Sequence, residues 1–193
     1  MRVLIACEFS GIVRDAFLKL GFDAVSCDLL DTERPGPHVK GDVRDILCDG
    51  WDLMIAHPPC TYLSAVGSRY WKYRAHEQQL AIQFFLELAN APIKRIAIEN
   101  PSGIMSTVYR KPDQYIEPWW FGSERSKRTG LWLKNLPKLR PTKIVDNHCE
   151  WILKVPCNKD RWKIRSRTDF AIAEAMACQW TSNYFYQTKL NSE

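Results

Sequence analysis

The chain has 193 residues, of which 46% are hydrophobic and 25% are charged, and its formal net charge is +5. This composition excludes a disordered chain, and the length suits one domain. The seven cysteines form no C-x-x-C pair, which argues against a disulfide framework and a zinc site. The start of the chain lacks signal-peptide features, and no apolar run is long enough to span a bilayer. We therefore expect a cytoplasmic protein without a metal or a membrane segment.

The first hundred residues alternate short apolar runs with amphipathic stretches, which is typical of a parallel α/β sheet. Strands are predicted near residues 2–6, 23–28, 51–57 and 95–100, and helices at 12–20, 41–47, 75–91 and 165–180. Gly21 is expected to end the first of these helices. Residues 31–39 and the stretch after Cys60 are expected to be loops. In the second half, the aromatic stretches 116–122 and 129–135 predict a β-hairpin.

Three of the predicted strands end in polar or helix-breaking clusters, which read ACEFSG, AHPPCT and IENPSG. In open α/β sheets, ligands bind outside the carboxyl ends of the strands. We therefore expect the three clusters to face one crevice.

The turn after the first strand contains Phe9, Ser10 and Gly11, and it lets the backbone and the N–H groups of the next helix approach a cofactor. Asp28, at the end of the second strand, is placed to bind ribose hydroxyls. The alternatives are a plain tight turn for the first cluster and a capping role for Asp28. Asp42 precedes a short helix, so it is either a binding residue or a helix N-cap.

Cys60 follows Pro58 and Pro59, so a rigid backbone directs it into the crevice as a candidate nucleophile. A nearby cation would lower the pKa of its thiol, whereas the alternative is a buried structural cysteine. Glu99 follows an apolar strand, a setting that raises a carboxyl pKa and allows a proton to be shared with a ring nitrogen. Asn100 can donate and accept at once, and the alternative for this pair is a turn cap.

Across residues 1–105, the order FSG, acid, GD, PPC, ENP resembles the motif series of the DNA cytosine carbon-5 methyltransferases. The resemblance implies a Rossmann-like class I methyltransferase fold, a mostly parallel sheet with helices on both faces, and S-adenosyl-L-methionine (SAM) as cofactor. It implies that Cys60 attacks carbon-6 of cytosine, while Glu99, supported by Asn100, contacts ring nitrogen-3 and the amine. By the same resemblance, the SAM methionine would lie against Phe9, Ser10 and Gly11, its ribose against Asp28, its adenine against Asp42, and the pocket floor would be Pro58.

An arginine motif is expected after the glutamate, and Arg125 or Arg128 in SERSKRTG could hold the base carbonyl or a phosphate. The alternative is a solvated hairpin turn. We interpret residues 1–193 as one methyltransferase domain in which residues 134–168 form a reduced, basic, substrate-facing segment. Basic residues there lie near Trp151 and Trp162, as suits phosphate contacts and base stacking.

The predicted function is methyl transfer to cytosine carbon-5 in DNA. The small size leaves single-stranded DNA, a short-context target or a free nucleotide as alternatives to a duplex, because a duplex base must be flipped out. The same chemistry on RNA and a non-catalytic SAM- or DNA-binding protein also stay open. An amino-methyltransferase is less favoured, because His57 stands where that class has Asp or Asn. The oligomeric state is not predicted.

Overall fold

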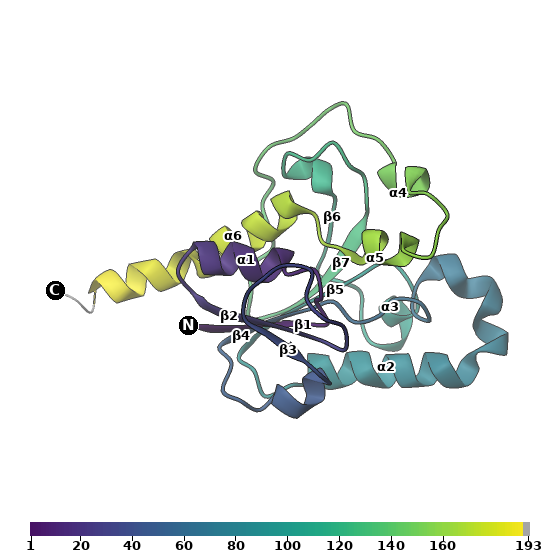
Figure 1. Ribbon diagram of the computed structural model, residues 1–193, viewed down its shortest axis with the longest axis horizontal. Coiled ribbons are helices and arrows are strands. Elements are labelled where there is room, and N and C mark those ends of the chain that lie inside the picture. The colour runs from purple at the N-terminus through teal and green to yellow at the C-terminus, as the bar shows by residue number, and fades with distance from the viewer. Residues whose placement is uncertain (191–193) are drawn as a thin grey trace.

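The computed structural model describes residues 1–190, with side chains placed for all of these except 152–153 and 183–190. Its centre is a seven-stranded sheet with the order β3-β2-β1-β4-β5-β7-β6 (Figure 1). The strands are β1 Arg2–Ala6, β2 Asp23–Asp28, β3 His38–Lys40, β4 Leu53–Ala56, β5 Arg95–Asn100, β6 Gln114–Ile116 and β7 Thr129–Lys134. The pairs among β1 to β5 are parallel, and β7 is antiparallel to both β5 and β6. The predicted α/β class with a mostly parallel sheet is confirmed.

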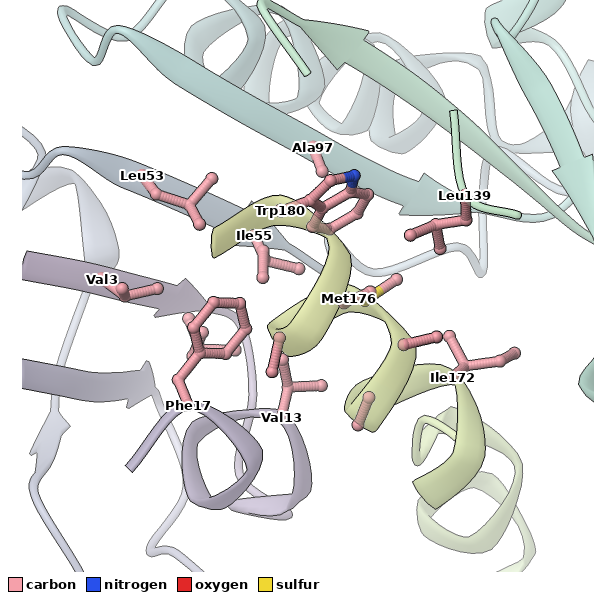
Figure 2. Packing of buried hydrophobic residues seen from close by; sticks show 14 of the residues in the cluster. Val3, Val13, Phe17, Leu53, Ile55, Ala97, Leu139, Ile172, Met176 and Trp180 are labelled. Atoms are coloured by element: carbon pink, nitrogen blue, oxygen red, sulfur yellow. The ribbon is translucent and has the colours of Figure 1, made fainter. Parts of the chain in front are cut away.

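Helices cover both faces of the sheet, because each face is apolar and must be buried. The longer helices are α1 Ile12–Lys19, α2 Ala75–Ala89 and α6 Phe170–Leu190, and the short ones are η1 Val43–Ile46, η2 Ala65–Tyr73, α3 Met105–Val108, η3 Pro118–Trp120, α4 Trp151–Lys154 and α5 Arg161–Ser166. In Figure 2, Phe17 of α1 and Met176 and Trp180 of α6 pack over the strand residues Val3 and Ile55. On the opposite face, α2 and η1 pack against β1, β4 and β5.

The sequence placed most elements of the first half correctly. Helix α1 begins at Ile12, and Gly21 after it has the left-handed φ of 80° that a terminating glycine adopts. The sequence missed β3, a three-residue edge strand that forms because His38 pairs with Ser26 of β2. The segment after Cys60 was also expected to be a loop, whereas it contains η2.

The predicted aromatic hairpin exists, but its first strand lies earlier than expected. Strand β6 ends at Ile116, which pairs with Thr129 of β7, and the following Pro118–Trp120 forms a 3₁₀ turn. Pro118 has no N–H to donate to a sheet ladder, so the strand cannot continue through it.

The strand order reverses between β1 and β4, which is the point where doubly wound sheets bind ligands. The sequence clusters after β1 and β4 therefore flank this point, and the cluster after β5 lies one strand further along. Residues 191–193 of the predicted single domain lie outside the described residues. Along residues 1–190, no helix combines the length and apolarity needed to cross a membrane.

Candidate active site

Backbone pairing brings the ends of β1, β4 and β5 side by side. Ala6 pairs with Ala56, which in turn pairs with Ile98, and the N–H of His57 donates to the Ala6 carbonyl at 2.9 Å. The three predicted clusters thus converge at one edge of the sheet. This convergence follows from the parallel topology, because parallel strands have their carboxyl ends at the same edge.

The turn after β1 is built around a buried carboxylate. Glu8 accepts hydrogen bonds from the N–H groups of Val13 at 2.7 Å and Arg14 at 3.3 Å, and from the Ser10 hydroxyl at 3.0 Å. Gly11 has a φ of 71°, and a Cβ there would lie within 2.5 Å of the Arg14 guanidinium, so only glycine fits. Two N–H groups expected to face a cofactor are therefore occupied by the protein's own carboxylate.

A cavity of about 270 Å³ opens beside this turn, between the ends of β2 and β4. Its walls are formed by Cys7, Cys27, Asp28, Leu29, Gly41, Asp42, Val43, Arg44, Pro59 and Phe84. Burial raises the pKa of Asp28 despite the hydrogen bond from the Leu30 N–H. Asp42 both lines the cavity and caps η1, and its hydrogen bonds from Arg44 lower its pKa. Both predicted aspartates thus meet at one cavity.

The other residues predicted to bind the cofactor lie elsewhere. Phe9, Ser10 and Gly11 are in the β1–α1 turn and outside the walls of this cavity, and the proline that lines it is Pro59. Pro58 is buried, and its carbonyl accepts a hydrogen bond from Nδ2 of Asn100 at 2.9 Å.

Two hydrogen bonds join the HPPC segment to the end of β5. One is the Asn100–Pro58 bond, and the other joins Nδ1 of His57 to Oε2 of Glu99 at 2.8 Å. The side chains of His57 and Glu99 are 8% and 12% exposed, so this contact is almost fully shielded from solvent. In the described structure, Nε2 of His57 and Oδ1 of Asn100 are buried without a partner. Such atoms are the usual partners of a ligand or an ordered water.

Glu99 is ionised, contrary to the expectation from its apolar strand. Burial favours the neutral acid, but Lys127, His57 and a hydrogen bond from Thr129 outweigh it and lower the pKa to about 2. Lys127 and Thr129 reach Glu99 because β7 pairs with β5. Sequence reasoning missed His57 and Lys127 as site residues, although one stands directly before PPC and the other is in SERSKRTG.

Cys60 is exposed and lies in the electrostatic field of Glu99. Desolvation by surrounding atoms and the Glu99 charge raise the pKa of the thiol, while Lys127 and Arg165 act in the opposite direction. The predicted cations are present, but they do not lower the pKa below its usual value. The resting form at neutral pH is therefore the thiol.

Arg125 and Arg128 stack on aromatic rings. The Arg128 guanidinium lies 4.2 Å from the Tyr115 ring centroid, and that of Arg125 lies 4.7 Å from Trp151. The structure thus places Arg128 over Tyr115, and its role in holding the base stays a prediction.

The end of the predicted basic segment reaches the candidate site. Trp162 of α5 contacts Phe9 with ring centroids 5.9 Å apart, and the carbonyl of Arg167 accepts from Nζ of Lys127 at 3.2 Å. Arg165 affects the pKa of Cys60, as noted above. Among the described residues, no group of three or more His, Cys, Asp or Glu side chains could hold a metal ion.

The chain has the Rossmann-like fold of solved methyltransferase structures. One is a protein from an E. coli prophage described as a DNA modification methyltransferase, with 15% identity and a TM-score of 0.50, covering 75% of this chain and 52% of that one. Another is an Entamoeba histolytica methyltransferase with 15% identity and a TM-score of 0.50, covering 75% and 57%. This chain thus spans little more than half their length. No protein-family model and no curated protein sequence matches it.

Proposed function

We propose that the chain is a SAM-dependent methyltransferase that methylates carbon-5 of cytosine in DNA through a covalent adduct with Cys60. The observation that supports this most is the pair of hydrogen bonds that fixes the segment ending in Cys60 against the end of β5. Nδ1 of His57 donates to Oε2 of Glu99 at 2.8 Å, and the Pro58 carbonyl accepts from Nδ2 of Asn100 at 2.9 Å. Cytosine activation requires a nucleophile that approaches carbon-6 from one face of the ring and a carboxylate at the ring edge that carries nitrogen-3 and the amine.

The cavity suits the adenosine part of SAM. Asp28 and Asp42 can accept hydrogen bonds from ribose hydroxyls and an amino group, while Leu29, Val43 and Phe84 offer apolar surface to a purine. When bound, SAM supplies an electrophilic methyl group on a sulfonium. Because Pro59 lines the cavity and Cys60 follows it directly, the nucleophile lies at the edge of this space.

The proposed reaction has three steps: addition at carbon-6, methylation at carbon-5 and elimination. The sulfur of Cys60 forms a bond to carbon-6, its S–H bond breaks, and one proton is taken up at ring nitrogen-3, so the total charge does not change. Carbon-5 then becomes nucleophilic and would take the methyl group, with the electrons of the broken methyl–sulfur bond staying on the departing thioether. Loss of the carbon-5 proton to a base or solvent, with cleavage of the carbon–sulfur bond, restores the aromatic ring and the free Cys60.

Glu99 acts in this scheme as a carboxylate. Since it is ionised before the base arrives, it accepts hydrogen bonds from the cytosine amine and from the protonated nitrogen-3. The resulting ion pair stabilises the positive ring, which is the form that a sulfur nucleophile attacks. His57 and Lys127 hold the carboxylate in that state and position.

The position of the methyl group tests the proposal. We expect mass spectrometry of nucleosides from cytosine-containing DNA, after incubation with protein and SAM, to detect 5-methylcytosine. N4-methylcytosine in its place would support amino-methylation. Product formed on RNA or free nucleotides alone would mean that DNA is not the substrate. Bound SAM without product on any of these substrates would support a non-catalytic protein.

Asp28→Asn tests the cofactor site. A carboxylate that binds a ribose contributes about 1.5–3 kcal/mol, so we expect SAM to bind about 10- to 100-fold more weakly by calorimetry. Asp31→Asn is the matched control, because Asp31 is three residues away, exposed, and paired with Lys40 at 2.8 Å. Equal affinity of both variants would place the adenosine elsewhere.

A further inference from the structure

Residues 69–74, with the sequence RYWKYR, form an exposed basic and aromatic surface that the proposed chemistry does not use. Tyr70 is 52% exposed and Tyr73 is 73% exposed, values unusual for large aromatic side chains in a folded domain. No acidic residue occurs between Pro58 and His76, so the positive charge of this stretch is not neutralised locally. We call residues 69–74 the RYWKYR segment.

Two of the three cations of the RYWKYR segment, Arg69 and Lys72, lie over its tyrosine rings. The Arg69 guanidinium is 5.1 Å from the Tyr70 centroid, and Nζ of Lys72 is 4.7 Å from that of Tyr73. Each cation is attracted to one face of its ring, and the rest of both rings stays largely exposed to solvent. The segment therefore offers stacking surfaces and phosphate-binding groups in alternation.

The residues just before the RYWKYR segment are hydrogen-bonded both to Cys60 and to the loop that follows Asn100. The Cys60 carbonyl accepts from the N–H groups of Leu63 at 3.1 Å and Ser64 at 2.9 Å. The N–H of Ile104 donates to the Leu63 carbonyl at 2.9 Å, and a Cβ at Gly103 would overlap that carbonyl oxygen. Only glycine permits this approach, so η2 is held against the loop that follows Asn100. In Figure 1, the short helix before α2 lies at the same end of the molecule as α3 and α5.

We propose that the RYWKYR segment binds single-stranded DNA and leads it to Cys60. This inference rests on the proposed function and names its substrate class. Unpaired bases expose their faces and can stack on Tyr70 and Tyr73, while the cations contact the phosphates. A duplex hides those faces, so its bases could not use the tyrosines.

The binding test uses a fluorescent 20-nucleotide oligothymidine, which contains no cytosine and so isolates the segment from the chemistry. We expect Tyr70→Ala/Tyr73→Ala to weaken binding about 10- to 100-fold by anisotropy, in line with stacking of one or two bases. Arg69→Gln/Lys72→Gln should reduce the slope of log affinity against log salt by about 1.4, because two phosphate contacts are lost.

Lys19→Gln/Lys94→Gln is the matched control. It removes the same charge from exposed positions at the end of α1 and before β5, at the opposite edge of the sheet. We expect this control to bind oligothymidine within about threefold of the parent chain, since distant exposed charges contribute little at physiological salt. Thermal unfolding of each variant checks that the fold is kept.

Two results would overturn the inference: tyrosine variants that bind as well as the control, or a parent chain that prefers duplex DNA or RNA to single-stranded DNA. Failure of the proposed function is distinguishable. Without methyl transfer, the parent would still bind oligothymidine through the segment. With methyl transfer but no role for the segment, the variants would methylate single-stranded DNA at the parental rate.

Discussion

Replacement of Cys60 by alanine is expected to abolish a covalent adduct that the parent chain forms with DNA containing 5-fluorocytosine. Sulfur adds at carbon-6 and the methyl group is transferred, but carbon-5 then carries fluorine and has no proton to lose. Elimination is blocked, so the carbon–sulfur bond persists and is detected by denaturing electrophoresis and by mass spectrometry of the Cys60 peptide. We expect the adduct to require SAM and to approach one per chain.

Cys48→Ala is the control for this experiment, because Cys48 is also an exposed, unpaired cysteine. It should form the adduct at the parental rate. An adduct that persists in the Cys60→Ala chain, or that maps to another cysteine, would contradict the assignment of the nucleophile. Single-stranded, duplex and nucleotide forms of the fluorinated substrate compared side by side would also rank the substrate classes.

Glu99→Gln is expected to change two measurements in opposite directions. Methylation should fall by a factor of about 10² to 10⁴, because glutamine cannot form the ion pair with the protonated ring. Alkylation of Cys60 by iodoacetamide should become faster at pH 7–8, because the Glu99 charge raises the pKa of the thiol. Removing that charge lowers the thiol pKa and increases the thiolate fraction at any pH below it.

Lys127→Gln is expected to change the alkylation rate of Cys60 in the opposite direction, because Lys127 lowers the pKa of both Cys60 and Glu99. Its Cys60 should alkylate more slowly than that of the parent. Glu77→Gln, in the first turn of α2, removes an exposed carboxylate and should leave the alkylation rate unchanged. The measurement is the rate of modification of the Cys60 peptide across pH 6–10. Equal rates for Glu99→Gln and the parent would mean that the two groups do not interact.

Much of the first half could be predicted because local pattern and tertiary environment agree there. β1 and β4 are apolar runs buried on both faces, as parallel strands are, and α1 combines an apolar face with a terminating glycine. The motif order then placed Cys60 and Glu99 at the ends of adjacent strands. The charge of Glu99 raises the pKa of the Cys60 thiol, which is consistent with that placement.

Three elements were harder to predict because each depends on partners distant in the sequence. β6 has three residues and exists through pairing with β7, and β3 depends on β2 in the same way. None of the side chains of the short helix η2 is buried, and backbone hydrogen bonds hold its start to the turn at Cys60 and the loop after Asn100. Such contacts leave no periodic signal in the sequence.

The ionisation state of Glu99 could not be predicted from the sequence. The residue types, their order and the strands that carry them determined which groups meet: a cysteine, a carboxylate and two aspartates at the carboxyl edge of a parallel sheet. The tertiary structure decided how these groups behave. Long-range pairing brings Lys127 and His57 to Glu99, and because charge interactions depend on distance and burial, those neighbours reverse the pKa shift that the apolar strand alone implies.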